Sequence, residues 1–295
     1  SPVELDKQAS SDAFRAIARN CLHQIIANEP GVCAGDAEAL HQMRIGLRRL
    51  RTAIASFAAI SAGPEQDKIK AELKWATKAL GPARDLDVLA TDVLKHLRET
   101  DADEREFTGA SCDFALRRAE AYAGTKDIVR SDRFRRVLLD VVEWVETGPW
   151  TGGAAAYADP QRPVAEHAAE VLAKLRKSVR KKGMRLPELS ARARHKLRIK
   201  VKNLRYNIEF FAGLFPGHKN AKRREAALSS LKSLQDTLGS LNDIVTRRAL
   251  VSDGESLDAH AAAMVEAEEA KADKLLDQAR AANADFSRVK AFWKS

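Results

Sequence analysis

The sequence contains few cysteines, few aromatic residues and no long hydrophobic run. Its three cysteines, Cys21, Cys33 and Cys112, include no C-x-x-C pair, so we expect a reducing compartment, the cytoplasm, rather than a disulfide framework. No segment approaches the roughly eighteen uninterrupted apolar residues of a membrane helix, so no membrane span is expected. The first residues, SPVELDKQASSDAF, contain no apolar stretch, and no secretory signal is expected there.

Motifs for nucleotide and metal chemistry are missing as well. The sequence has no G-x-x-x-x-G-K-[ST], no G-x-G-x-x-G and no H-E-x-x-H. Its seven histidines are scattered, so neither a metal site nor another cofactor is predicted. Phosphoryl transfer normally needs carboxylates that hold Mg²⁺ beside the phosphate, and the basic segments described below contain none. We therefore expect a protein that is not an enzyme.

The charge that is present is concentrated in one place. The 295 residues are 45% apolar and 31% charged, which is typical of a folded protein and not of a disordered one. Residues 176–205 hold 13 Lys or Arg and a single acid, Glu188, so this window carries +12 while the whole chain carries only +9. The rest of the chain is therefore slightly acidic. Such a local excess of positive charge indicates a site for a polyanion.

The hydrophobic pattern predicts an all-α protein. Apolar residues recur every three or four positions almost throughout, and hairpin signals are rare. Gly and Pro residues mark expected helix ends, among them Gly239. The segment 148–163, rich in Gly, Pro and small residues, predicts a linker between two domains, residues 1–147 and 164–295. The expected helices cover residues 10–28, 37–60, 65–80, 85–99, 103–122, 131–147, 164–182, 190–214, 219–238, 242–251 and 256–281.

Two patterns occur in the same order in both halves. The first, H-Q-M-R-I-G-L-R-R-L-R from His41, matches H-K-L-R-I-K-V-K-N-L-R from His195 at an offset of 154 residues. The second, L-G-P-A-R-D from Leu80, matches L-G-S-L-N-D from Leu238 at an offset of 158 residues. Two linked matches in one order indicate an internal duplication, and so two related helical bundles.

The first pattern places its cations in a row on each helix. At about 100° per residue, positions i, i+3, i+7 and i+10 fall within about 80° of one another. An apolar seam with a 4-3-4-3 spacing lies about 120° away and is expected to pack in the core. The N-terminal ladder is His41, Arg44, Arg48 and Arg51, with the seam Met43, Leu47, Leu50, Ile54 and Phe57. The C-terminal ladder is His195, Arg198, Lys202 and Arg205, with the seam Leu197, Val201, Leu204, Ile208 and Phe211.

Two interpretations of the ladders are possible. They could be ordinary solvated helix faces, but such faces usually mix acids with bases because like charges repel by a few tenths of a kcal/mol per pair. Residues 41–51 and 189–205 contain no acid at all. Repulsion of this kind suggests a ligand that supplies the negative charge.

The paired signatures resemble those of CHAD, the conserved histidine α-helical domain. The L-G-x-x-R-D and L-G-x-x-N-D patterns agree with this family, and the resemblance covers nearly the whole chain. It implies two four-helix bundles related by pseudo-two-fold symmetry, with the basic helices lining a central groove or pore. It also implies binding of inorganic polyphosphate and, in bacteria, association with polyphosphate granules.

Carried over residue by residue, the resemblance assigns both ladders to polyphosphate binding. Lys74 and Lys232, on the next helix of each half, would complete the walls, and Arg84 is a further candidate. Asp85 could orient Arg84, but an Asp in this position is more often a helix N-cap, which we expect for Asp85 and Asp243.

Two questions stay open for the basic residues around the ladders. The ladder histidines could contact phosphate directly or make structural hydrogen bonds. The basic run Arg176–Arg185 and the neighbouring Arg192 and Arg194 could extend the groove or be solvated.

A nucleic-acid-binding protein that uses the same basic surface is the alternative function. It is less expected because aromatic residues make up only 6% of the chain, which leaves few platforms for stacked bases. The cations also flank a core seam instead of projecting from a recognition helix. Inorganic polyphosphate is therefore the expected partner, and the sequence indicates no protein partner.

Overall fold

The computed structural model describes residues 9–99, 104–148, 161–252 and 271–293. These residues form helices and contain no β-strand, so the all-α prediction is confirmed. They fall into two compact units, an N-terminal unit up to Arg162 and a C-terminal unit from Pro163. Most of the predicted linker and most of the helix expected at 256–281 lie outside the described residues. None of the described helices is both long and apolar enough to cross a bilayer.

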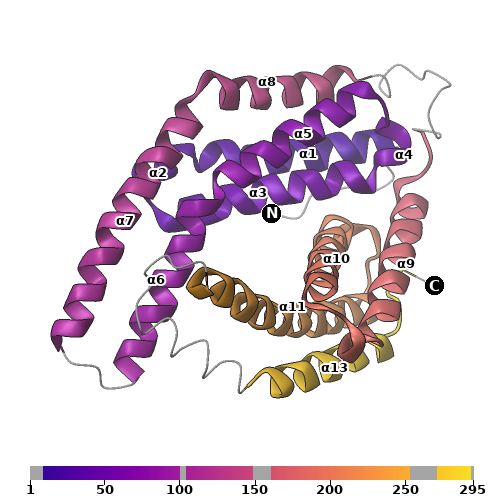
Figure 1. The fold of residues 1–295 in the computed structure, drawn as a ribbon. Coiled ribbons are helices and arrows are strands. Elements are labelled where there is room, and N and C mark those ends of the chain that lie inside the picture. The colour runs from indigo at the N-terminus through magenta and orange to yellow at the C-terminus, as the bar shows by residue number, and fades with distance from the viewer. Residues whose placement is uncertain (1–8, 100–103, 149–160, 253–270, 294–295) are drawn as a thin grey trace. The chain divides into compact units, whose positions relative to one another are not determined.

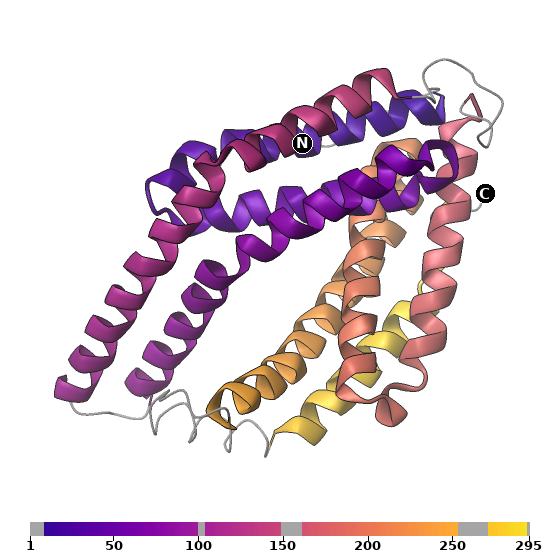
Figure 2. The same ribbon diagram turned by 45° about the horizontal axis from the view of Figure 1, so that its top comes forward.

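The N-terminal unit combines a bundle with a helical pair (Figure 1). Helices α1, α3, α5 and α8 pack on one another, while α6 and α7 lie side by side and extend away from this bundle (Figure 2). The short helix α2 contacts α3 and α7. The elements are α1 (Ser10–Ala27), α2 (Glu29–Cys33), α3 (Ala37–Ser56), α4 (Ala58–Ser61), α5 (Pro64–Ala79), α6 (Gly81–Glu99), α7 (Glu104–Arg130) and α8 (Asp132–Thr147).

The core of this unit holds α3 by its apolar seam. All five predicted seam residues, from Met43 to Phe57, are fully buried. Phe57 packs against Phe14 of α1 with ring centroids 5.5 Å apart, and Phe14 meets Trp144 of α8 at 5.7 Å. Burial of side chains of this size stabilises by roughly 1.5–3 kcal/mol each, so the rotation of α3 about its own axis is fixed.

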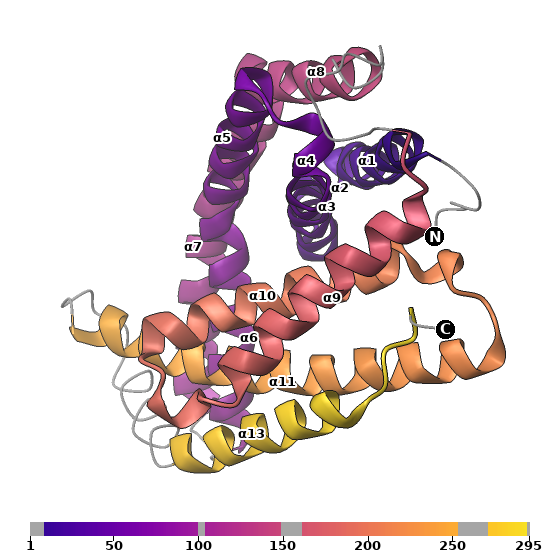
Figure 3. The ribbon, with the colours of Figure 1, turned by 90° about the vertical axis from the view of Figure 1, so that its right-hand side faces the viewer.

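The C-terminal unit is built around α10 (Figure 3). Helix α10 packs against both α9 and α11, and α13 packs against α11 and α9. The predicted seam of α10, from Leu197 to Phe211, is at most 1% exposed at every position. The elements are α9 (Val164–Gly183), η2 (Leu186–Glu188), α10 (Ala191–Phe210), η3 (Ala212–Leu214), α11 (His218–Ser252) and α13 (Ala272–Arg288).

The two ladder helices have matching boundaries. Helices α3 and α10 begin and end 154 residues apart, which is the offset of the sequence repeat. Their N-caps, Asp36 and Ser190, are separated by the same offset, and each side chain accepts hydrogen bonds from backbone N–H groups of the first turn. These caps satisfy N–H groups that would otherwise lack partners at the start of a helix.

Several expected helix boundaries are wrong. The helix expected to end at residue 281 continues to Arg288, and the helix expected at 190–214 ends at Phe210 and is followed by η3. Helix α11 runs without a break through Gly239, where a stop was expected, and so joins the segments 219–238 and 242–251. Helix α7 continues past Gly124 to Arg130, whereas the expected helix ended at residue 122. The helix expected at 37–60 is interrupted at Phe57, which separates α3 from α4. A helical glycine costs only about 0.5–1 kcal/mol relative to alanine, so packing on neighbouring helices can override it.

Candidate functional site

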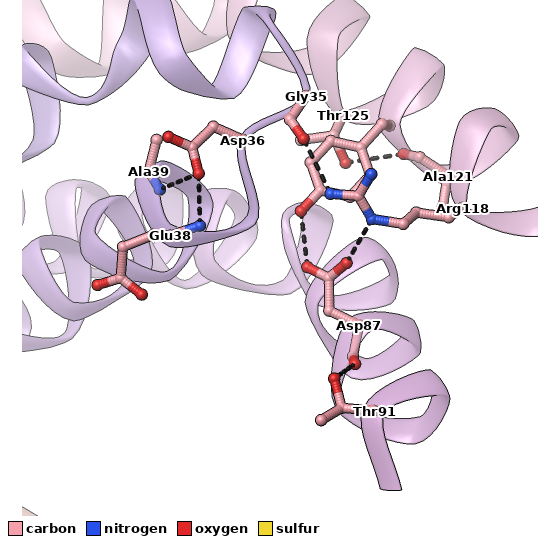
Figure 4. Close-up of polar contacts among 10 residues, drawn as sticks. Gly35, Asp36, Glu38, Ala39, Asp87, Thr91, Arg118, Ala121 and Thr125 are labelled. Atoms are coloured by element: carbon pink, nitrogen blue, oxygen red, sulfur yellow. Dashed lines mark hydrogen bonds and ion pairs between the residues drawn. The ribbon is translucent and has the colours of Figure 1, made fainter. Parts of the chain in front are cut away.

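A polar network fixes the chain just before α3 (Figure 4). Gly35 adopts a φ of 81°, a left-handed conformation that glycine tolerates, and its carbonyl accepts a hydrogen bond of 2.9 Å from Arg118 Nη2. Arg118 Nε donates to Asp87 at 2.9 Å, and the Tyr122 hydroxyl donates to the same carboxylate at 2.6 Å. Asp87 is only 7% exposed. Helices α6 and α7 thus hold the turn from which the N-terminal ladder starts.

The N-terminal ladder lies beside its buried seam, with all four side chains partly exposed. Arg44 Nη1 donates to the Thr77 carbonyl at the end of α5 at 3.1 Å. The same guanidinium lies close to Gly81, where a Cβ would be 3.6 Å from Nη1. Arg44 is therefore oriented by the junction between α5 and α6.

The charge around His41 is positive. Burial lowers the pKa of His41 most, and the positive charge of Arg84 lowers it further. The Glu38 carboxylate raises this pKa, while Arg48 and Arg44 lower it. Burial and the neighbouring cations thus both favour the neutral form of the imidazole.

The arginines of this ladder also act on one another. Burial lowers the pKa of Arg44, Asp85 opposes this shift, and Arg48 and Arg84 add to it. Burial and the charge of Arg48 lower the pKa of Arg51. Arginine keeps its charge in spite of such shifts. Arg84 of α6 is thus close enough for its charge to act on His41 and Arg44 of α3, and its part in polyphosphate binding stays a prediction.

The C-terminal ladder faces α11. His195 Nδ1 lies 2.7 Å from Asn242 Oδ1, and because an amide oxygen only accepts, the ring nitrogen is the donor. Asn242 occupies the position that Arg84 has in the first repeat. His195 therefore makes a structural hydrogen bond through one ring nitrogen, and its Nε2 takes no part in that bond.

Arg198 lies directly over Gly239. A Cβ at Gly239 would be only 3.1 Å from Arg198 Nη2 and 3.5 Å from the guanidinium carbon. Arg198 Nη1 is also 3.9 Å from Asp243 Oδ1, within ion-pair distance. The absence of a side chain at Gly239 thus lets the guanidinium approach the α11 backbone, which explains a glycine inside a continuous helix.

The two aspartates of the L-G-x-x-[RN]-D patterns are not helix caps, and the expectation of capping is wrong. Asp85 lies one turn inside α6, and Asp243 lies well within α11. The negative charge of Asp85 instead raises the pKa of Arg44, and Asp243 forms an ion pair with Arg198. In each unit the carboxylate therefore faces the first arginine of the ladder.

The last rung of the C-terminal ladder lies beside a pocket. Arg205 Nη1 donates to Gln235 Oε1 at 2.9 Å, and Arg205 and Lys232 both line a pocket of about 480 Å³. Lys202 is partly exposed one turn earlier on α10. Lys74, the counterpart of Lys232, is exposed on α5, and its part in the site stays a prediction, as does a groove shared by the two ladders.

Part of the basic run before α10 has a structural role. Arg176 donates to two backbone carbonyls near the end of α13 and lies over the Phe286 ring, 5.8 Å from its centroid. Arg185 pairs with Glu188 at 2.8 Å. Arg194 donates to the Leu189 carbonyl at 2.8 Å. Arg176 therefore connects α9 to the end of α13, whereas Arg185 and Arg194 make local contacts.

Sequence reasoning missed the residues that orient or extend the ladders. The recurrence of Gly81 and Gly239 at the same offset was a usable signal, because a glycine repeated within a helix indicates a close approach. Arg224, which also lines the pocket, carried no such signal because its counterpart in the first repeat is Gln66. Among the described residues, no group of three or more His, Cys, Asp or Glu side chains is placed to hold a metal ion.

The fold of this chain is similar to the folds of two solved structures. The structure matches the CHAD domain from the plant Ricinus communis with a TM-score of 0.76 and 28% identity, over 99% of this chain and 98% of that chain. It matches PptA from Streptomyces chartreusis with a TM-score of 0.61 over 96% and 99% of the two chains, where 16% identity shows the fold alone. No curated protein matches the sequence. The model of the CHAD domain family matches residues 16–252, and the chain therefore belongs to this family.

Proposed function

We propose that this protein binds inorganic polyphosphate through its two ladders, without catalysis, and that this binding brings it to polyphosphate granules. The observation that carries the proposal is the crowding of cations on helices that contain no acid in the ladder segments. Burial and neighbouring arginines lower the pKa of His41, Arg44 and Arg51, so the positive charges disfavour one another. A polyanion relieves this repulsion.

The arrangement suits a linear phosphate polymer. Successive rungs on one helix face are about 5–6 Å apart, so each ladder offers a regular series of donors for repeating phosphate units. Arginine donates to phosphate oxygens through its planar fork, and lysine supplies a mobile point charge. The aromatic residues at the end of the ladder helices, such as Phe57 and Phe211, are buried in the core, where they cannot stack on bases.

The proposal includes no chemical step. The carboxylates nearest the ladders, Asp85 and Asp243, each face an arginine and lie in different units. Each is therefore better suited to orient an arginine than to bind Mg²⁺ beside a phosphate. Incubation with long-chain polyphosphate and Mg²⁺ or Mn²⁺ tests this point, and metal-dependent release of phosphate by the purified protein would contradict it.

Binding itself is tested by titrating the full chain with long-chain polyphosphate at moderate salt. We expect saturable binding that is lost when four rungs, two in each unit, are changed to glutamate. The control variant changes four exposed cations outside the ladders and should keep the binding. The ladder variant is Arg44→Glu, Arg48→Glu, Arg198→Glu and Lys202→Glu. The control variant is Arg130→Glu, Arg136→Glu, Lys219→Glu and Lys290→Glu.

Two further measurements separate the possible outcomes. Equal loss of binding in both variants would mean that only the net charge matters, and the ladders would then not be the site. Duplex DNA that displaces polyphosphate at a comparable concentration of phosphate would instead favour a nucleic-acid-binding function. In cells that store polyphosphate, a fluorescent fusion of the wild type should collect at the granules, and a fusion of the ladder variant should not.

A further inference from the structure

The C-terminal unit has a pocket at the end of its ladder. The pocket lies between α10 and α11 and has a volume of about 480 Å³, within the usual range for small-ligand sites. Its charged lining consists of Arg205, Arg224, Lys232 and Glu225, and Ser229 adds a hydroxyl. Arg205 is the last rung of the ladder, so the pocket is a place where a bound chain could end.

Hydrogen bonds hold the two arginines of the pocket in place. Arg205 Nη1 donates to Gln235 Oε1 at 2.9 Å, and Arg224 Nη1 donates to the Ala212 carbonyl at 2.9 Å. The Arg205 Nε is buried and has no hydrogen-bond partner. Both guanidinium groups are thus oriented before an anion arrives.

The N-terminal unit keeps counterparts of two pocket cations, Arg51 and Lys74, and has Lys70 at the position of Leu228, but it differs at two polar positions of the lining. At the offset of 158 residues, the counterpart of Arg224 is Gln66, and that of Ser229 is Ala71. Gln66 is buried, and its amide nitrogen donates to Ser61 Oγ at 2.6 Å. The two ladders therefore differ at this end, although their rungs match.

The charge of the pocket fits one part of a polyphosphate chain better than the rest. Three cations and one carboxylate leave a net charge of +2. An internal phosphate unit carries one negative charge, whereas a terminal unit loses a second proton with a pKa of about 6, as phosphate monoesters do. A terminal unit at neutral pH therefore carries nearly two negative charges.

We infer that this pocket binds the terminal phosphate of a polyphosphate chain, and that the C-terminal unit thereby recognises chain ends and short linear polyphosphates. This inference rests on the proposed function, because the ladder leads the chain to the pocket. The ladder binds internal units, and the pocket binds the doubly charged end. Arg224 and Ser229 are the residues that distinguish the two units in this respect.

The test compares a short linear anion that has ends with a cyclic anion that has none. Tripolyphosphate and cyclic trimetaphosphate are titrated into the full chain at fixed salt and pH. We expect Arg224→Gln, which installs the residue of the first repeat, to weaken tripolyphosphate binding about tenfold and trimetaphosphate binding less than about twofold. Arg223→Gln removes the same charge from the adjacent residue, which does not line the pocket, and should change neither.

A second variant guards against a folding defect in Arg224→Gln. Ser229→Ala removes only the pocket hydroxyl and should weaken tripolyphosphate binding about twofold to threefold, again with little effect on trimetaphosphate. The inference is overturned if tripolyphosphate does not bind the wild type, or if Arg224→Gln and Arg223→Gln have the same effect on the two probes.

Long-chain polyphosphate separates failure of this inference from failure of the proposed function. If the pocket inference alone fails, the wild type still binds long chains through its ladders, and Arg224→Gln affects both short probes equally. If the proposed function alone fails, the variant with four ladder cations changed to glutamate binds long chains as well as the wild type does, but Arg224→Gln still weakens tripolyphosphate selectively.

Discussion

Salt should weaken polyphosphate binding in proportion to the number of ladder cations that the polyanion contacts. Each contacted phosphate releases bound counterions, so the logarithm of the affinity falls linearly with the logarithm of the salt concentration. For single-stranded polyanions the slope is about −0.7 per contact. The four cations of one unit predict a slope of about −2.8, and those of both units about −5.6. The cations counted are the ladder residues and one neighbouring cation in each unit: Arg44, Arg48, Arg51 and Arg84 in one unit, and Arg198, Lys202, Arg205 and Lys232 in the other.

These slopes correspond to large and separable changes in affinity. Doubling the NaCl concentration should weaken binding about sevenfold if one unit binds, and about fiftyfold if both do. Arg48→Gln or Lys202→Gln removes one contact and should reduce the magnitude of the slope by about 0.7, and the double variant by about 1.4. Titration calorimetry at several NaCl concentrations measures the slope directly.

The matched control is Arg136→Gln, which removes an exposed cation of α8 that belongs to neither ladder. This variant should leave the slope unchanged, because counterions released elsewhere do not depend on Arg136. If Arg136→Gln and Arg48→Gln reduce the slope equally, binding depends on the net charge of the chain, and the reasoning from the ladders is refuted.

Three further predictions concern the surroundings of the ladders. Because burial and neighbouring cations lower the pKa of His41, a bound polyanion should raise it and binding should take up a proton, so affinity should rise as the pH falls from about 8 to about 6. His41→Gln should reduce this pH dependence, and equal profiles for both proteins in calorimetry would contradict the shift. Gly239→Ala should leave the melting temperature equal or higher but weaken polyphosphate binding several-fold, because the new Cβ displaces Arg198. Gly81→Ala, whose Cβ makes an ordinary 3.6 Å contact, should bind like the wild type, and the reverse order would count against this explanation. Tyr122→Phe removes the hydrogen bond to a buried carboxylate and should lower the free energy of unfolding by about 1–2 kcal/mol in a urea titration, while no change would mean that water replaces the hydroxyl.

The parts of the fold that the sequence predicted well depend on local spacing. The seams of α3 and α10 are buried at every expected position because a 4-3-4-3 apolar pattern can face the core in only one rotation of a helix. Once the seams are placed, the ladder cations must lie on the adjacent face. Helices α3 and α10, which carry the repeated pattern, also have matching bounds in the structure.

The expectations that proved wrong concern residues whose roles depend on contacts between helices. A glycine after a leucine predicts a helix end, and only the approach of Arg198 shows why Gly239 lies inside α11 instead. Asp243 resembles an N-cap in sequence, but the partner that defines its role lies 45 residues earlier in the chain, on α10. Single-sequence patterns contain no information on such pairs, so these roles became visible only in three dimensions.

Helix α11 differs from its counterpart in a way that affects how the C-terminal ladder behaves as a whole. This one helix carries the partners of three rungs, Asn242, Asp243 and Gln235, whereas the contacts of the N-terminal ladder are divided between α5 and α6. Each residue of a helix advances by about 1.5 Å along the axis, so one unbroken helix fixes the spacing of these three partner residues. The rungs of the C-terminal ladder should therefore align or lose alignment together, whereas the break between α5 and α6 at Leu80 leaves the partners of the N-terminal ladder on two separate helices.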